Sequence, residues 1–254
     1  MGGRAGRAGA ARSLVLPTIF TIAALAVLVA LGTWQLQRLA WKEALIAAVE
    51  ARADAPAVPP PGPPWDGLDL ETIDYQHVTT TGRFLPGEAH VYSVLSDARG
   101  PVSGPGYWIV APFETDAGWI VLVNRGFVPP DRKEPASRPA PPSGEIRLDG
   151  VVRGHDTPGT FTPEPDPVAN QWFVRDAGVL SRAFDLPAGK PLAPYTIDAS
   201  AEMMPEGGLP QAGETRRIFP NNHLQYALTW YGLALALAGV YAVFAWGRLR
   251  RGRE

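Results

Sequence analysis

The sequence contains no cysteine and only three methionines among its 254 residues. Without cysteine there can be no disulfide, no thiolate zinc site, no cysteine-ligated iron–sulfur cluster, no covalently attached c-type haem and no catalytic thiol. Copper carriers built on paired thiolates are excluded for the same reason, and three methionines are too few for a methionine-rich copper site. Any metal bound by this chain must therefore be held by other side chains.

The sequence also has little net charge and no disordered composition. Its net charge of −2 at neutral pH gives no reason to expect binding to nucleic acid. The 27 prolines and 27 glycines make up about a fifth of the chain, which is below the level that signals disorder. These averages hide the fact that the apolar residues are concentrated near the two ends.

Two runs of 23 residues, 14–36 and 224–246, contain no charged side chain. As a helix, each run would be about 34 Å long at about 1.5 Å per residue. The hydrocarbon core of a bilayer is about 30 Å thick and needs about 20 apolar residues to span it. The sequence therefore predicts two transmembrane helices.

The first apolar run has an alternative interpretation. A basic start, an apolar run and the small residues around Ala30 are also typical of a signal peptide. However, the run is longer than the apolar part of most signal peptides, and Trp34 and Arg38 at its end resemble an anchor at the membrane interface. We favour an uncleaved helix, with the signal peptide as the alternative.

The charges outside the two runs predict the orientation in the membrane. The tails at residues 1–13 and 247–254 carry a net charge of +6, which leaves −8 for residues 37–222. Positively charged tails stay in the cytoplasm. Both termini are therefore predicted to be cytoplasmic, and residues 37–222 are predicted to form an acidic domain on the outer face.

The outer domain is predicted to be β-rich. Residues 38–52 keep a helical composition and could extend the first helix, and the proline-rich residues 56–64 are predicted to run extended. A short helix is predicted at residues 176–184. Sequential strands with short turns indicate antiparallel pairing in a small barrel or sandwich. The predicted strands are runs rich in β-branched and aromatic residues, at 75–84, 89–95, 107–113, 119–128, 145–152 and 195–198.

Signals for catalysis are weak in this domain. Ser103 lies between glycines, but the spacing does not match a nucleophile elbow, and the segment is predicted to be a turn. Glu88 and His90 would share a strand face, although two groups do not make a metal site. His77, His90 and His155 are predicted to be hydrogen-bonded or exposed imidazoles.

His223 differs because it opens the second apolar helix, with Asn222 as a plausible N-cap. Ionisable groups at membrane depth are costly and suggest a function. Tyr226, Trp230 and Tyr231 follow His223 at helical spacing, so that one face offers an imidazole and large aromatic planes. An imidazole is a standard axial ligand of haem iron. The alternative is a histidine that simply reaches water from a helix end in an aromatic belt.

The two helices are predicted to pack on each other through faces of small residues, with Ala26 and Ala30 in the first and Ala234 and Ala238 in the second. This packing would place the outer end of the first helix at the same depth in the membrane as the first residues of the second helix.

Trp34 and Arg38 are expected to lie at the depth of His223. The Arg38 guanidinium could pair with a carboxylate of the protein or of a haem propionate. The alternative is an ordinary arginine at the membrane interface.

Five strings, in order along the chain, carry a resemblance to a known family. Together with the two helices around an outer domain, they resemble the surfeit-locus-one family of cytochrome c oxidase assembly proteins. The strings are LGTWQLQR followed by WK at residues 31–42, TGRF at 81–84, VNRGFVP at 123–129, NQWFVRD at 170–176 and NNHLQYALTWYG at 221–232.

This resemblance implies a non-enzymatic function in the maturation of haem–copper oxidases. The resemblance to bacterial members implies binding of haem a and its transfer toward the catalytic subunit, and the histidine that matches His223 is the candidate axial ligand of the haem iron. Tyr226, Trp230, Trp34 and Arg38 would then belong to the haem site. The implied partners are the catalytic subunit, the haem a synthesis enzyme and membrane lipid. The implied location is the bacterial inner membrane, with the outer domain in the periplasm.

Two other functions stay open. In the first, the chain is a cofactor-free scaffold whose outer domain holds oxidase subunits while His223 only packs. In the second, it is a membrane-anchored periplasmic enzyme, which a functional requirement for Ser103 would support.

Overall fold

The computed structural model describes the backbone of residues 3–215 and 221–251 and the side chains from residue 14 onward within those ranges. The chain forms two compact units. The first is a helical hairpin made from the two ends of the chain, and the second is a barrel domain spanning Ala48–Arg217. Each unit is described by itself.

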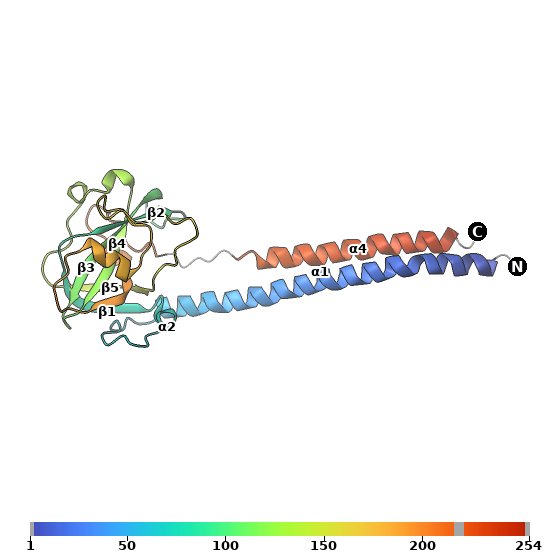
Figure 1. The fold of residues 1–254 in the computed structure, drawn as a ribbon, viewed down its shortest axis with the longest axis horizontal. Helices are drawn as coiled ribbons and strands as arrows, with labels where there is room; N and C mark the ends of the chain where they lie inside the picture. Colours follow the sequence, from blue (N-terminus) through green and yellow to red (C-terminus); the bar gives the residue numbers. More distant parts are fainter. Residues whose placement is uncertain (1–2, 216–220, 252–254) are drawn as a thin grey trace. The chain divides into compact units, whose positions relative to one another are not determined.

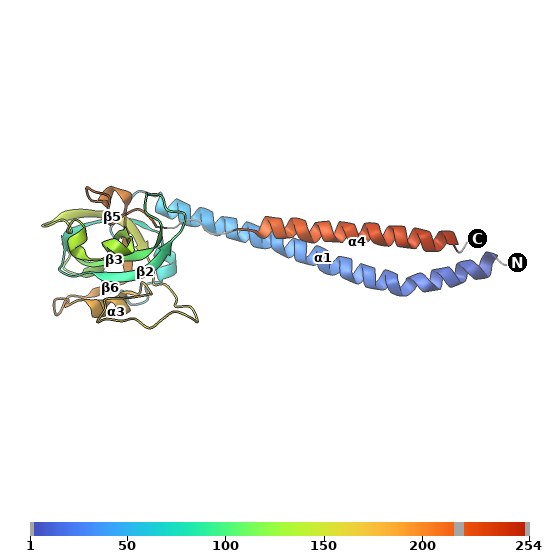
Figure 2. The same cartoon turned by 90° about the horizontal axis from the view of Figure 1, so that it is seen from above.

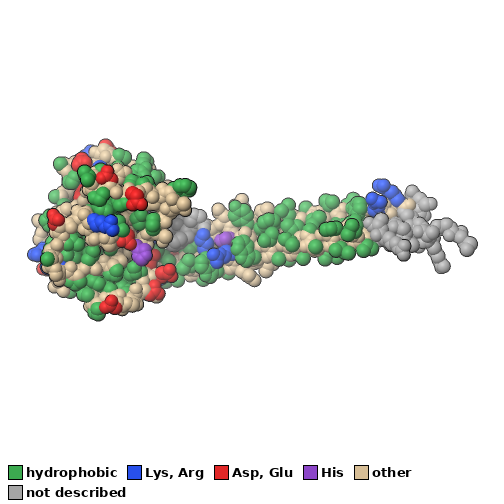
Figure 3. Space-filling model, viewed as in Figure 1, with side chains coloured by type: hydrophobic (Ala, Val, Ile, Leu, Met, Phe, Trp, Pro, Cys, Tyr) green, Lys and Arg blue, Asp and Glu red, His purple; other side chains and the backbone are tan. Residues whose placement is uncertain are grey.

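Two long helices form the hairpin, α1 (Gly3–Ala53) and α4 (His223–Arg251). They run side by side in opposite directions in both views (Figures 1 and 2). Both are long and apolar enough to cross a membrane, and Figure 3 shows hydrophobic side chains over much of the hairpin surface. Residues 38–52 continue α1 as predicted, so the domain boundary predicted at residue 37 falls inside this helix.

The positions of α1 that are withdrawn from solvent recur at alternating spacings of four and three residues, which is the seam of a coiled-coil-like pair. The sequence shows no heptad pattern, because the outward positions are as apolar as the inward ones. The prediction that Ala26 and Ala30 face α4 is wrong, because both are exposed. The positions at this spacing are Leu14, Thr18, Thr21, Leu25, Leu28, Gly32, Gln35 and Leu39 on α1 and His223, Ala227, Trp230, Ala234, Leu237 and Tyr241 on α4; Pro17 and Leu31 on α1 and Tyr231 and Ala238 on α4 lie beside them and are also partly buried.

The barrel domain contains all six predicted strands. Five of them form a closed barrel in the order β1-β5-β6-β4-β3, which a pairing between β1 and β3 completes, and β2 extends the sheet beside β3. The alternative of a sandwich is therefore excluded. The strands are β1 (His77–Phe84), β2 (Ala89–Leu95), β3 (Gly104–Thr115), β4 (Ile120–Val128), β5 (Ile146–Arg153) and β6 (Leu192–Ala199).

One pairing departs from the antiparallel arrangement that the short turns predict. β4 and β6 are parallel, because β6 enters the barrel between β4 and β5 after a long connection. That connection contains the short helix predicted at residues 176–184, which is observed as α3 (Ala177–Leu180) followed by a 3-10 turn (Ser181–Ala183). A second short helix, α2 (Leu70–Ile73), precedes β1.

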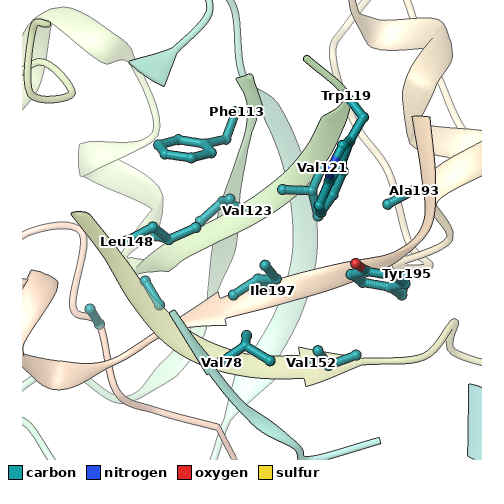
Figure 4. Packing of buried hydrophobic residues seen from close by; sticks show 12 residues of the cluster. Val78, Phe113, Trp119, Val121, Val123, Leu148, Val152, Ala193, Tyr195 and Ile197 are labelled. Carbon is teal, nitrogen blue, oxygen red and sulfur yellow. The ribbon is translucent and has the colours of Figure 1, made fainter. Parts of the chain in front are cut away.

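The hydrophobic core has two parts, one on each face of β4. Val121 and Val123 point into the barrel, where they pack with Phe113, Ile197 and other buried residues (Figure 4). Leu122 points outward and packs under α3 with the buried Trp172. All nine residues of β4 are buried, which explains why its sequence, apart from Asn124 and Arg125, is apolar on both faces of the strand rather than alternating.

We expect Phe113→Ala to destabilise the barrel domain strongly. Phe113 is fully buried and packs edge-to-face on Phe84 with ring centroids 5.1 Å apart, so that its removal leaves a cavity and should lower the free energy of unfolding by about 3–5 kcal/mol. Urea denaturation of the full-length protein, followed by tryptophan fluorescence, measures the loss. Val94→Ala, at a side chain that is 55% exposed, should change it by less than about 0.5 kcal/mol; equal effects would contradict this account of the core.

Candidate functional site

His223 lies at the first position of α4 and faces α1 across the seam. Its Nδ1 is 2.7 Å from Oε1 of Gln35. Because an amide oxygen only accepts hydrogen bonds, Nδ1 carries the hydrogen and donates it. In the neutral imidazole Nε2 then keeps its lone pair, and it makes no hydrogen bond within the described part of the chain. This is the tautomer that an imidazole needs in order to bind a metal through Nε2.

The other aromatic residues predicted at this site differ in how far they are exposed. Trp34 precedes Gln35 directly, so it lies at the level of His223 along the hairpin. Trp34 and Tyr226 are more than half exposed, whereas Trp230 is half-buried in the seam. The hairpin therefore offers exposed aromatic rings on both helices close in sequence to the His223–Gln35 pair.

Arg38 is exposed and makes no ion pair with a carboxylate among the described residues. Its guanidinium carbon lies 4.1 Å from the ring centroid of Trp41, one turn farther along α1. This cation–π contact does not use the guanidinium N–H groups as hydrogen-bond donors to an acceptor atom, so they can still bind an anion.

Close packing and polar contacts fix the register of the two helices around His223. A Cβ at Gly32 would lie 2.8 Å from the ring of Tyr231, so a larger residue there would force that ring to move. The Tyr231 hydroxyl is 3.1 Å from the Thr33 hydroxyl, and a second pair joins Thr18 to Tyr241 nearer the other end of the hairpin. Such contacts hold helices in place where no hydrophobic force distinguishes a helix from lipid.

The remaining histidines have ordinary surroundings, as the sequence predicts. His77 contacts Asp149 and the carbonyl of Ala55, and Nε2 of His90 is 2.7 Å from Oε1 of Glu88. His155 is exposed. No group of three His, Asp or Glu side chains that could hold a metal occurs among the described residues.

Ser103 lies exposed in the described loop between β2 and β3, where no hydrogen-bonded turn is found. No hydrogen bond joins it to a base within the segments that the structure describes. The geometry therefore gives no support to a serine nucleophile.

A buried carboxylate on β6 organises the barrel domain. Asp198 is 3% exposed and accepts hydrogen bonds from Nδ2 of Asn124 at 2.9 Å, Nη1 of Arg175 at 3.0 Å and the Thr215 hydroxyl at 2.9 Å. Burial alone would raise the pKa of Asp198, but the positive charges of Arg175 and Arg153 lower it below its ordinary value. Asp198 is therefore an anion in the folded protein.

The sequence gives no indication of this network. Asn124 and Arg175 belong to two of the strings that carry the family resemblance, yet their meeting at Asp198 depends on the parallel pairing of β4 with β6. A cleft of about 280 Å³ opens beside the network, bordered by Arg153, Arg175 and the rings of Tyr92 and Trp108. The charges of its two arginines are largely used by Asp74, Asp156 and Asp198, so that it has little positive charge left for a ligand.

Comparison with known proteins agrees with the resemblance noted in the sequence. The SURF1 family profile matches residues 22–235. A SURF1-like protein of Monosiga brevicollis is 36% identical over 218 residues, which cover 82% of this chain and 80% of that protein. Surfeit locus protein 1 of Homo sapiens is 37% identical over 220 residues, covering 81% and 70%. The Mus musculus protein of the same name is 35% identical over 219 residues, covering 81% and 68%.

We predict that Asp198→Asn destabilises the protein near neutral pH and that its effect fades in acid. The lowered pKa of Asp198 means that the unfolded chain, with an aspartate pKa of about 3.9, binds a proton more readily than the folded one. Its stabilising contribution is thus complete above about pH 5 and is lost as the pH falls through the folded-state pKa. Breaking a buried pair costs about 3–5 kcal/mol, and Arg175 keeps Asp156 as a second partner, so we expect about 3 kcal/mol.

Urea denaturation of both full-length proteins between pH 7 and pH 2.5 measures the difference in unfolding free energy. The matched control is Asp156→Asn, whose carboxylate also pairs with Arg175 but is 42% exposed and should matter less. A difference for Asp198→Asn that stays constant over this range would contradict the prediction.

Proposed function

The chain belongs to the SURF1 family, and on that premise we propose that it is an assembly factor for a haem–copper cytochrome c oxidase. In this proposal it is not an enzyme but binds haem a transiently and noncovalently and assists its insertion into the catalytic subunit. The two apolar helices would cross a bacterial inner membrane with both termini in the cytoplasm and the barrel domain in the periplasm. Further partners would be the haem a synthesis enzyme and membrane lipid.

The observation that carries the proposal is the state of His223. The Gln35 amide oxygen fixes the hydrogen on Nδ1, and a ligand histidine needs such a partner behind it to hold its tautomer and orientation. The donor set therefore fits the iron of a haem, which supplies the redox centre and takes imidazole nitrogen as an axial ligand. The absence of cysteine leaves noncovalent attachment as the way to hold haem.

The residues around His223 fit the rest of such a ligand. The exposed rings of Trp34 and Tyr226 can cover an apolar macrocycle, and the free edge of the Arg38 guanidinium can pair with a propionate. A carrier must also release its cargo. One histidine at a helix start gives weaker retention than a closed pocket with two protein ligands would.

We expect His223→Ala to lose most of the haem that copurifies with the full-length protein. The protein would be produced in cells that make haem a and purified in mild detergent, and its optical spectrum would be recorded. Gln35→Leu keeps the ligand but removes its supporting hydrogen bond, and should weaken haem binding about 10-fold to 100-fold. His155→Ala, at an exposed histidine of the barrel domain, is the control and should retain haem. Full retention of haem in His223→Ala would exclude it as the ligand.

A cofactor-free scaffold is the second candidate, and one surface feature favours it. Phe161 and Val168, on the long loop between β5 and α3, are 95% and 99% exposed, as expected for side chains that a partner covers. If the loop holds oxidase subunits, Phe161→Ser with Val168→Ser should reduce their copurification severalfold without changing haem content. Unchanged copurification would remove this support for the scaffold function.

A further inference from the structure

Arg125 occupies an irregular position in β4. Asn124 is paired with Val110 of β3, but the next pair along the strands joins Gly126 to Ile109, so Arg125 has no partner on β3. It is the extra residue of a β-bulge. Bulges redirect a side chain and occur often beside functional sites.

The residues on both sides of Arg125 fix the bulge. The Asn124 side chain accepts a hydrogen bond from the backbone N–H of Gly126 at 3.1 Å while it donates to Asp198. Gly126 has φ +134°, and a Cβ there would lie 2.5 Å from the backbone carbonyl of Gln211. Only glycine fits this position. The string Asn124-Arg125-Gly126 therefore builds a rigid support that directs the arginine.

The Arg125 guanidinium is buried without a hydrogen-bond partner. Its residue is 6% exposed, its Nη1 is fully buried, and it makes no hydrogen bond or ion pair in the described part of the chain. Burial, and then the charge of Arg138, lower the pKa of Arg125 to about 10, so it remains a cation at neutral pH. The carboxylate of Glu88, which acts on it through space, is already bonded by Arg138 and His90.

Arg125 lines a largely apolar cavity of about 280 Å³ at one end of the barrel interior. Phe84, whose ring lies 5.6 Å from the guanidinium carbon, forms one wall, and Leu148, Met203 and Met204 form others. The acid of this lining, Glu202, is exposed and makes no ion pair with Arg125. The site thus joins an apolar body to a single uncompensated positive charge.

We propose that this cavity binds a small molecule that carries one carboxylate on an apolar stem. The planar fork of N–H groups on arginine matches a carboxylate, and the hydrophobic walls take up the stem. A single cation, with Glu202 near the rim, suits a monoanion better than a doubly charged phosphate. The ligand would neutralise a charge that the protein leaves unpaired.

The probe for this site is phenylacetate, and its neutral analogue phenylacetamide is the control ligand. Isothermal titration calorimetry of the full-length protein in lipid nanodiscs should show saturable binding of phenylacetate. Phenylacetamide, which lacks the charge, and acetate, which lacks the apolar stem, should both bind more weakly. Arg125→Gln should weaken phenylacetate binding by about tenfold or more, as expected for the loss of a charged hydrogen-bonded contact, and leave the amide unaffected. Arg182→Gln, at an exposed arginine of the same domain, should bind as the unchanged protein does.

Equal affinity for phenylacetate, phenylacetamide and acetate would overturn the proposal, and so would full binding by Arg125→Gln. Thermal unfolding provides a second test, which does not require a binding constant to be measured. Arg125→Met removes an unpaired buried charge, so its melting temperature should equal or exceed that of the unchanged protein. Phenylacetate should raise the melting temperature only when Arg125 is present. A clear drop in the melting temperature of Arg125→Met would show that the arginine is a bonded structural group and would also overturn the proposal.

Discussion

The buried carboxylate of Asp198 is the constraint on which the barrel domain depends. A charged group that is almost wholly removed from water is costly unless its neighbours supply donors and positive charge. Here those neighbours come from three segments far apart in the sequence, namely β4 through Asn124, the segment before α3 through Arg175, and the chain beyond β6 through Thr215. One carboxylate thereby fixes how the loops are held against the barrel.

Asp198 also helps to position Arg125, a residue that it does not contact. Because the side-chain NH2 of Asn124 is held by Asp198, the side-chain amide oxygen of Asn124 can accept the N–H of Gly126. This pair of bonds stabilises the bulge, and the bulge directs Arg125 toward the end of the barrel interior. The ionic network is therefore structural in itself, while the group that it positions is left without a partner. This separation explains why the cleft beside Asp198, although bordered by two arginines, is the weaker candidate for binding an anion.

Local patterns in the sequence predict the local structure well, and nonlocal contacts are what they miss. Uncharged apolar runs give both long helices, and β-branched runs give all six strands. Nothing in the runs of β4 and β6 says that they are neighbours or that they are parallel. The same limit applies to the sites: His223 stands out by its place at a helix start, but Gln35, its partner, is 188 residues away. The exposed Ala26 shows that an all-apolar helix does not reveal which face is covered.

His223 and Arg125 each keep a side-chain nitrogen without a hydrogen-bond partner among the described residues. Buried polar groups in folded proteins nearly always have a hydrogen-bond partner. A buried polar group without a partner lowers the free energy of unfolding, and proteins accept this cost mainly at functional sites. Gln35 holds one nitrogen of His223 and leaves Nε2 free, whereas Asn124 and Gly126 hold the backbone of Arg125 and leave its guanidinium free. In both units, rigid support thus lies behind a polar group whose bonding the chain does not complete. Arg138 and Arg175, by contrast, make hydrogen bonds or ion pairs with at least two partners each, and this contrast supports the two ligand proposals made for His223 and Arg125.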